Sequence, residues 1–266
     1  MMNTQHTPDE LLVRTENGVA TVTFNRPQAR NAMTWAMYQQ LSKSCHSFKA
    51  DPSVKAVVFR GAGGQAFVAG TDIEQFKTFS TGDDGVAYEA QIESCIELLC
   101  SLPMPTVAVI EGWAVGGGLA IATACDFRLA TPGSQLGVPI AKTLGNCLSM
   151  ANVARLSAAF GPQRVKRILM LAEMIGADEA LACGYLHQIA DPSDIDAATT
   201  ALVQRFMALA PVTQQVSKEA LNRLVLNSAP NTQAAEDLIR KAYGSEDFRE
   251  GVQAFVAKRK PHWKGY

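Results

Sequence analysis

The apolar residues of this chain follow two spacings, one typical of strands and the other typical of helices. Residues 10–15 and 19–24 flank Asn17-Gly18, a dipeptide that favours a hairpin when it separates two strand-like runs. Residues 54–59 and 106–110 are short, continuous apolar runs, which are typical of buried strands. The pattern therefore predicts one hairpin and, farther along the chain, buried strands.

Helical spacing separates these strands and dominates the C-terminal part. A first helix is expected behind a cap at Thr34, and its apolar face carries Tyr38, Leu41, Cys45 and Phe48. A second helix is expected from about residue 86 to 102, and its apolar face carries Ile92, Ile96 and Leu99. From about residue 195 onward the pattern is helical, interrupted at Pro211 and Pro230.

The order of the elements indicates a repeated unit of two strands and a helix. Strand-like residues 126–130 and 135–137 precede helices that are expected from about residue 147. This alternation predicts an α/β fold of stacked ββα turns rather than a plain parallel sheet. Residues 80–85 are rich in Ser, Thr, Gly and Asp, and we interpret them as a flexible loop beside the active site.

Composition describes an ordinary globular protein. The 266 residues are 47% hydrophobic and 18% charged, which is enough apolar material for a sizeable core. The formal net charge of −1 gives no indication of nucleic-acid or lipid binding. A polyanionic ligand would need a local basic patch instead.

The cysteines and the N-terminal residues exclude several other classes. No C-x-x-C pair occurs among the six cysteines, so neither a zinc site nor a redox motif is expected, and no metal site is predicted. Residues 1–6 lack the basic and apolar regions of a signal peptide. No apolar run reaches the roughly 18 residues that a membrane span needs. We therefore expect a cytoplasmic protein that binds neither membrane nor nucleic acid.

Two loops of small residues carry the strongest chemical signal. They are Ala66-Phe67-Val68-Ala69-Gly70-Thr71-Asp72 and Gly112-Trp113-Ala114-Val115-Gly116-Gly117-Gly118. Each loop opens a predicted helix, where backbone N–H groups have no partner inside the helix and the helix dipole is positive. Two such N–H groups aimed at one point form an oxyanion hole, which stabilises the anion formed from a thioester carbonyl.

Further segments in the same order identify a family. They are Asn25-Arg26-Pro27, Arg30-Asn31-Ala32-Met33, Pro105 to Gly112, Ala124 to Arg128, Asp247 to Gly251 and Ala254 to Pro261. Together with the two loops they resemble the crotonase superfamily, the enoyl-CoA hydratase/isomerase family of acyl-CoA enzymes. The resemblance covers nearly the whole chain.

The resemblance implies a crotonase-like spiral of ββα repeats with a C-terminal helical region. Residues 1–195 would form the core with the CoA-ester site, and residues 196–266 would form a helical oligomerisation region. A homotrimer, or two trimers paired into a hexamer, is implied. The substrate would be an acyl-CoA thioester, with coenzyme A as part of the substrate and no other cofactor.

The resemblance also assigns roles to particular residues. The two oxyanion N–H groups would belong to Thr71 and Gly117. The remaining substrate contacts would come from Arg26, Arg30, Ala69, Asp72, Ile73 and Lys258, with Lys260 as a further basic residue near the coenzyme A phosphates. Asp72 is interpreted as a cap that orients backbone donors rather than as a proton carrier.

Two positions depart from the pattern of the family's hydratases. Those enzymes place one glutamate three residues beyond the oxyanion glycine, where this chain has Ala120. They place the second directly after a proline, where this chain has Ile140, or Ala141 if the pattern is shifted by one residue. A general acid or base contributes about 10²–10⁴-fold, so ordinary hydratase activity is expected to be very weak.

Other polar residues are candidates for the missing chemistry. Asn146 is expected either to orient a water or a substrate group, or to cap a helix that starts near Cys147. Cys147 is expected to be packed inside rather than to act as a nucleophile, because no His lies near it in sequence. Glu74 and Glu111 are interpreted as surface or supporting residues, with a displaced catalytic carboxylate as the alternative.

Three functions are left open. The first is an enzyme that stabilises an enolate of an acyl-CoA thioester. It would be a lyase that needs little acid–base help, as in decarboxylation of a malonyl-type thioester, or a double-bond isomerase. The isomerase would need one proton carrier, such as Glu111, Glu74 or a water held by Asn146. The second is a non-catalytic acyl-CoA binding protein. The third is a CoA-thioester hydrolase that uses Cys147 or Ser149.

Overall fold

Two β-sheets organise residues 9–227 and 236–263, the residues that the computed structural model describes. The larger sheet, in strand order, contains β1 (Leu11–Glu16), β2 (Val19–Phe24), β3 (Ala56–Gly61), β5 (Thr106–Ile110), β7 (Phe127–Ala130) and β10 (Gln188–Ile189). The smaller sheet contains β4 (Ala66–Val68), β6 (Trp113–Val115), β8 (Gln135–Gly137) and β9 (Ile175–Gly176). The pairs β1–β2 and β8–β9 are antiparallel, and the other neighbours are parallel.

The predicted ββα repeat is confirmed. Successive repeats are β3–β4 with α2 (Gly82–Cys100), β5–β6 with α3 (Gly117–Ala124), and β7–β8 with α4 (Ile140–Thr143). The first strand of each repeat joins the larger sheet and the second joins the smaller sheet. Corresponding points of successive repeats are therefore stacked side by side, which brings the start of η2 (Ile73–Phe76), after β4, close to the start of α3.

The N-terminal predictions are also confirmed. Asn17 and Gly18 have φ values of 49° and 79°, as the predicted two-residue turn requires, and they join β1 to β2. The side chain of Thr34 accepts a hydrogen bond of 3.2 Å from the Met37 amide and caps α1 (Trp35–Ala50). A short 3₁₀ helix, η1 (Pro27–Ala29), connects this hairpin to α1.

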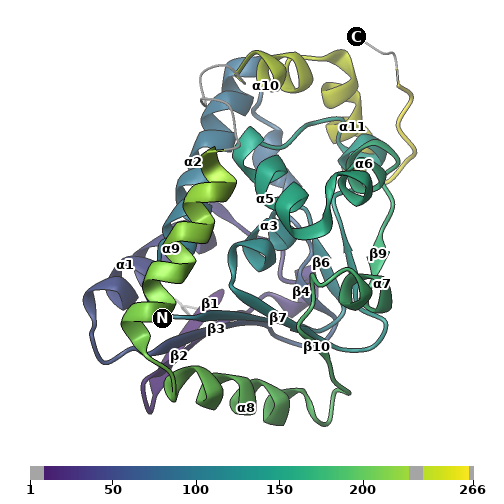
Figure 1. The fold of residues 1–266 in the computed structure, drawn as a ribbon. Helices are drawn as coiled ribbons and strands as arrows, with labels where there is room; N and C mark the ends of the chain where they lie inside the picture. The colour runs from purple at the N-terminus through teal and green to yellow at the C-terminus, as the bar shows by residue number, and fades with distance from the viewer. Residues whose placement is uncertain (1–8, 228–235, 264–266) are drawn as a thin grey trace, which may run out of the picture.

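The central strands β3 and β5 of the larger sheet are buried on both faces, which explains their continuous apolar runs. Val57 and Phe59 of β3 pack into the main core, whereas Val58 between them packs with Val109 and Phe206 on the opposite face. Phe206 belongs to α8 (Ile195–Met207), which lies along the outer face of the sheet (Figure 1). Alternate residues of one strand thus serve two cores.

Helices complete the chain. They are α5 (Met150–Phe160), α6 (Pro162–Met170), α7 (Ala177–Ala182), α9 (Pro211–Asn227), α10 (Glu236–Tyr243) and α11 (Glu246–Val256). Figure 1 shows α10 beside one end of α2 and α11 next to α10, both far from α8. The helical C-terminal region is confirmed, with Pro211 at the start of α9. Pro230 lies outside the described residues.

Two predicted boundaries are wrong for a local reason. Residues 80–85 are not simply a loop, because α2 already begins at Gly82, and the Asp84 carboxylate accepts hydrogen bonds of 2.8 Å from the Ser80 and Thr81 amides. The helix expected near residue 147 begins at Met150, capped by the Ser149 hydroxyl. Within the described part of the chain, no helix is long and apolar enough to cross a membrane.

Candidate functional site

A cavity of about 430 Å³ brings the two small-residue loops together. The sequence-predicted site residues that line it are Arg30, Ala69, Thr71, Asp72, Ile73, Gly117 and Asn146. Ala120 and Ile140 also line it. The segments that carry these residues are far apart in sequence and meet because the ββα repeats stack.

Thr71 is held so that its own amide takes no part in the adjacent β-bridge. The Met33 amide donates to the Gly70 carbonyl and the Asp72 amide donates to the Met33 carbonyl, each at 2.9 Å. These bonds use the groups on either side of Thr71. The positive φ of Gly70, 107°, lets the chain turn here.

Gly117 is the first residue of α3, so its amide has no acceptor within the helix. A β-carbon at this position would lie 3.3 Å from the Thr71 hydroxyl oxygen and 2.5 Å from the Tyr38 hydroxyl oxygen. A β-carbon on the next residue, Gly118, would overlap the Val68 carbonyl of β4. The absence of side chains therefore allows the start of α3 to lie directly against the Thr71 loop.

Two buried tyrosines fix the Thr71 side chain. The hydroxyl oxygens of Tyr38 and Tyr88 each lie 2.9 Å from the Thr71 hydroxyl oxygen. Burial raises the pKa of both phenols above their usual range, so they act as neutral hydroxyls. The sequence pattern places Tyr38 on a helix face but gives no indication of this contact.

Glu89 is a buried carboxyl in the wall of the same cavity, and the sequence interpretation missed it. It accepts hydrogen bonds of 2.7 Å from the Tyr243 hydroxyl and 2.8 Å from the Ser149 amide. Burial raises the pKa of Glu89 to about 7, although these two hydrogen bonds favour the carboxylate. The sequence could have indicated that Glu89 is buried, because it precedes Ile92 by three positions and therefore shares the apolar face of the helix.

Asn146 does not cap a helix, so that alternative is wrong. The cap of α5 is Ser149, which accepts from the Asn152 amide. The Asn146 side-chain amide instead donates a hydrogen bond of 3.0 Å to the Tyr243 hydroxyl. Its carbonyl oxygen is buried and has no hydrogen-bond partner among the described residues.

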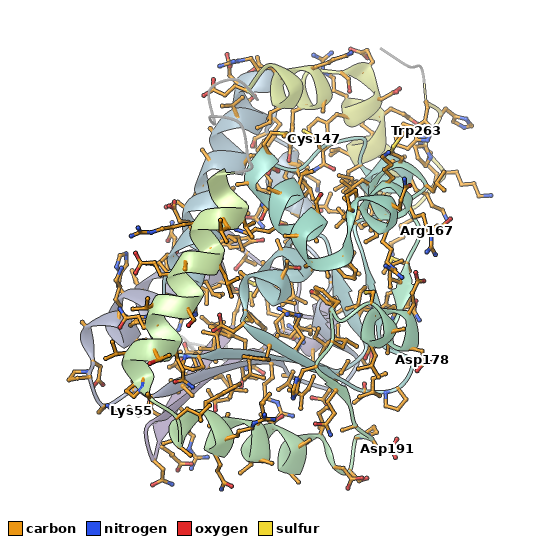
Figure 2. The ribbon with its side chains drawn as sticks, viewed as in Figure 1. Lys55, Cys147, Arg167, Asp178, Asp191 and Trp263 are labelled. Carbon is orange, nitrogen blue, oxygen red and sulfur yellow. The ribbon has the colours of Figure 1, made fainter. Side chains whose placement is uncertain are left out.

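The candidate nucleophiles are not activated. Burial raises the pKa of Cys147 to about 12, and this half-buried residue lies near the start of α5 (Figure 2). The Ser149 hydroxyl donates a hydrogen bond of 2.9 Å to Glu93. Of the histidines in the described part of the chain, none lines this cavity; His6 lies outside that part.

The predicted basic residues divide into three environments. Arg30 is exposed and lines the cavity. Arg26 forms ion pairs with Glu10 at 3.0 Å and Asp72 at 3.1 Å and does not line the cavity. Lys258 and Lys260 are exposed beyond the end of α11 and do not line it either.

The remaining carboxylates have structural partners, as predicted. Asp72 caps η2 by accepting a hydrogen bond of 3.2 Å from the Glu74 amide. Glu111 pairs with Arg60 at 3.0 Å, and exposed Glu74 pairs with Lys77. Among the described residues, no group of three or more His, Cys, Asp or Glu side chains is arranged to hold a metal ion.

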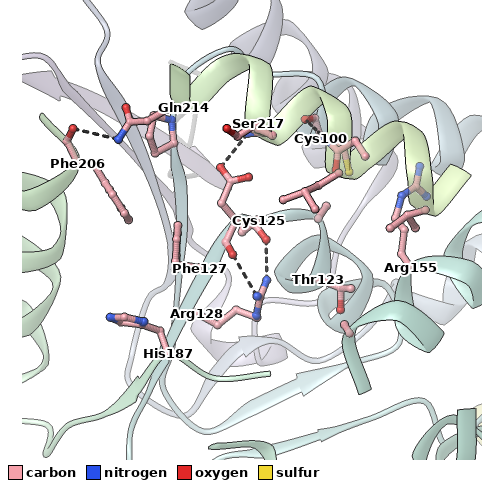
Figure 3. A pocket seen from close by; sticks show the side chains of 18 of the residues that line it. Cys100, Thr123, Cys125, Phe127, Arg128, Arg155, His187, Phe206, Gln214 and Ser217 are labelled. Atoms are coloured by element: carbon pink, nitrogen blue, oxygen red, sulfur yellow. Dashed lines mark hydrogen bonds and ion pairs between the residues drawn. The ribbon is translucent and has the colours of Figure 1, made fainter. Parts of the chain in front are cut away.

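A larger cavity of about 650 Å³ lies between β7, α8 and α9, and none of the predicted site residues lines it (Figure 3). Two of its charged residues, Asp126 and Arg128, have hydrogen-bond partners within the protein. The Asp126 carboxylate accepts hydrogen bonds from the Thr106 amide at 2.7 Å and from Lys218 at 2.8 Å. Arg128 donates to the carbonyl groups of Cys125 and Tyr185. These contacts stabilise the fold.

Comparison with known proteins agrees with this geometry. The family model described as enoyl-CoA hydratase/isomerase matches residues 14–266. The short-chain-enoyl-CoA hydratase of Clostridium acetobutylicum is 31% identical over 253 residues, which cover 95% of this chain and 96% of that protein.

Solved structures match over almost the full length. An enoyl-CoA hydratase/carnithine racemase from Magnetospirillum magneticum has a TM-score of 0.78 and 32% identity, covering 98% of this chain and 97% of that one. Methylmalonyl-CoA decarboxylase in complex with 2-nitronate-propionyl-CoA has a TM-score of 0.88 and 26% identity, covering 97% of this chain and 99% of that one. The chain therefore belongs to the enoyl-CoA hydratase/isomerase family, within the crotonase superfamily.

Proposed function

We propose that this enzyme binds an acyl-CoA thioester with its carbonyl oxygen between the amides of Thr71 and Gly117, and that it forms an enolate there. The observation that supports the proposal is that Thr71 and Gly117 line one cavity, with the start of α3 directly against the Thr71 loop. Tyr38 and Tyr88 hold the Thr71 side chain, and the bridge to Met33 holds its backbone, so its amide would be oriented before substrate binds. Preorganised donors of this kind are worth about 10²–10³ in rate each.

Efficient hydration of an enoyl-CoA is not the reaction we propose. The residues at the two positions where the family's hydratases carry glutamates are Ala120 and Ile140, and both line the cavity as apolar side chains. Neither can hold a water as a base or deliver a proton. The reaction we propose therefore forms the enolate in another way.

Decarboxylation of a malonyl-type thioester fits these residues best. Loss of CO₂ leaves its electron pair on the substrate and forms the enolate without a base. The Thr71 and Gly117 amides would then stabilise the oxygen anion. The likeness to methylmalonyl-CoA decarboxylase, at a TM-score of 0.88, supports this choice.

The same pose assigns the remaining substrate contacts. Arg30, exposed at the cavity, would contact the coenzyme A phosphates, and Ala69 and Ile73 would contact the rest of the ligand. Arg26 would act through its ion pair with Asp72, which caps η2 beside Thr71. Lys258 would reach the phosphates from the C-terminal region.

A homotrimer or hexamer also stays a proposal, and α9 supports it. Val212, Val216, Leu221 and Leu224 of this helix are between 60% and 70% exposed. Several exposed apolar side chains on one helix are typical of a surface that is covered in an assembly. We also propose a cytoplasmic location.

The proposal is tested by removing the Gly117 amide alone. Proline is tolerated at the first position of a helix and has no N–H. Its β-carbon would meet the Tyr38 hydroxyl, so the test compares Tyr38→Phe with Tyr38→Phe/Gly117→Pro. Turnover of methylmalonyl-CoA, malonyl-CoA and crotonyl-CoA is followed by mass spectrometry, with circular dichroism to check folding.

We expect decarboxylation to be faster than crotonyl-CoA hydration. We expect the decarboxylation rate of the double variant to be about 10²-fold or more below that of Tyr38→Phe. Equal turnover by the two folded variants would show that the Gly117 amide does not stabilise the oxyanion. Hydration at the rate of a good hydratase would overturn our interpretation of Ala120 and Ile140. Tight binding of acyl-CoA without any turnover would favour the non-catalytic binding protein.

A further inference from the structure

The wall of the thioester cavity contains a carboxyl group that the proposed function does not yet use. Glu89 lies in the middle of α2 and lines the cavity together with Thr71 and Gly117. The geometry points to Glu89 as the group that exchanges a proton with the carbon next to the thioester carbonyl. This inference rests on the proposed function, because it needs the enolate held by the Thr71 and Gly117 amides.

The hydrogen bonds of Glu89 leave it able to carry a proton. The Tyr243 hydroxyl donates to Oε1 and the Ser149 amide donates to Oε2. A carboxylate has about four lone-pair positions, so these two donors orient the group without using its full capacity. The side chain is 3% exposed, yet it lines the cavity, so it is accessible from the cavity rather than from bulk solvent.

Helix α2 links this carboxyl to the amides. Tyr88, the residue before Glu89, has its hydroxyl oxygen 2.9 Å from the Thr71 hydroxyl oxygen. Ile92, one helical turn farther on, lines the cavity as well. One face of α2 therefore supplies both a support for the oxyanion loop and the carboxyl.

Burial, more than any neighbouring charge, keeps Glu89 close to a balance between its two protonation states. Glu93, on the same helix, is a like charge that disfavours the carboxylate, but it is itself paired with Arg155 of α5 at 2.6 Å. Together with burial, this leaves the pKa of Glu89 at about 7, where both forms are well populated at neutral pH. Tyr243 of α10 faces the carboxyl as a hydrogen-bond donor.

Three further groups interact with this charge, namely Cys147, Tyr38 and Tyr88, and burial keeps all three neutral at this pH. Burial raises the pKa of Cys147, before α5, to about 12. It also raises that of Tyr38, on α1, above its usual range. Asn146 is a positioning residue here, because it donates to the Tyr243 hydroxyl, which in turn donates to Glu89.

Decarboxylation followed by protonation of the α-carbon balances with Glu89 as the proton donor. Breaking the bond between the α-carbon and the carboxylate releases CO₂ and leaves an enolate. The α-carbon then takes the proton of the Glu89 carboxyl, the carbonyl re-forms, and Glu89 remains as a carboxylate that water reprotonates. In the reverse direction, the Glu89 carboxylate takes an α-proton from an acyl-CoA. That reverse step can be observed alone, as exchange with deuterium in D₂O.

The experiment compares the wild-type protein with Glu89→Gln and with Glu111→Gln, the same substitution at an ion-paired glutamate away from the cavity. The first measurement is the rate of α-proton exchange of propionyl-CoA in D₂O, by NMR, as a function of pH. The second is the binding of a nitronate analogue of propionyl-CoA, an anion that resembles the enolate and requires the amides but no proton transfer.

We expect Glu89→Gln to bind the nitronate within about tenfold of the wild-type affinity. Its rate of α-proton exchange should be about 10²-fold or more below that of the wild type. Exchange by the wild type should rise with pH to a plateau, with a midpoint near the pKa of Glu89, and Glu111→Gln should behave like the wild type. A Glu89→Gln protein that binds the nitronate and exchanges normally would overturn the inference, as would a wild type that binds it without exchange. Failure of every variant, wild type included, to bind the nitronate would instead overturn the proposed function.

Discussion

Tyr243 donates its hydroxyl hydrogen to Glu89 across 2.7 Å, although the two residues are 154 positions apart. This bond fixes α10, in the C-terminal region, to the middle of α2. It also places Asn146 in the same network, because the Asn146 side chain donates to the Tyr243 oxygen at 3.0 Å. The C-terminal helices thus help to build the cavity wall, whatever part they take in assembly.

Removing this hydroxyl should shift the pH dependence of the enzyme. In Tyr243→Phe the Glu89 carboxylate loses a donor that favours its charged form, so the pKa of Glu89 should rise. The midpoint of α-proton exchange should move to higher pH, and the loss of a buried hydrogen bond should cost about 1–3 kcal/mol in unfolding free energy. The pH profile of exchange and urea unfolding check these two effects. An unchanged midpoint would contradict the link between Tyr243 and Glu89.

The stability of the protein should depend on pH through Glu89. The pKa of this group is about 7 in the folded protein against an ordinary value of 4.5, so folding favours the protonated form. Below about pH 4.5, Glu89 is protonated in both the folded and the unfolded state, so it does not lower the free energy of unfolding. As pH rises from there through about 7, the unfolded state loses the proton first, and the free energy of unfolding falls by as much as about 3 kcal/mol. Glutamine cannot ionise, so Glu89→Gln should gain stability relative to the wild type as pH rises.

Chemical denaturation of the two proteins at about pH 5 and about pH 8 measures this difference. The comparison is made at each pH, because glutamine has only one acceptor oxygen for the two donors, Tyr243 and the Ser149 amide. The cost of the lost hydrogen bond does not depend on pH. A difference in unfolding free energy that is the same at both pH values would show that Glu89 has no raised pKa.

The glycine after the proposed oxyanion residue should be essential for folding. A β-carbon at Gly118 would overlap the Val68 carbonyl oxygen, which cannot move without disturbing β4. Gly118→Ala should therefore cost more than about 3 kcal/mol, the upper end for ordinary overpacking. At Gly176, which has a negative φ, a β-carbon would find its nearest contact at 3.8 Å, so Gly176→Ala is the matched control. Equal urea midpoints for the two variants would contradict this packing.

The fold could be predicted because its signals are local. The Asn17-Gly18 turn, the cap at Thr34 and the apolar run of β5 each lie within a few residues of the structure they determine. The two loops around Thr71 and Gly117 could be recognised for the same reason. Their short, side-chain-poor sequences are what a close approach of two backbones requires.

The proton chemistry could not be predicted, because it depends on contacts between distant segments. Glu89 is buried by Tyr243 and Ser149, which are 154 and 60 positions away in sequence. The sequence favours Asn146 as a possible cap because Asn is a good capping residue and the helix is expected to start near Cys147. Tertiary packing starts α5 at Met150, which selects Ser149 and leaves Asn146 in the cavity wall.

Loss of the Cys147 thiol should leave catalysis intact. With a pKa of about 12, this thiol would be ionised in about one molecule in 10⁵ at neutral pH. Cys147→Ala should therefore change the rates of decarboxylation and of thioester hydrolysis by less than about threefold, whereas removal of a true nucleophile costs many orders of magnitude. Release of free coenzyme A from acyl-CoA esters, followed with a thiol reagent, gives the hydrolysis rate. A large loss of hydrolysis in a folded Cys147→Ala protein would restore the thioester hydrolase as the function of this chain.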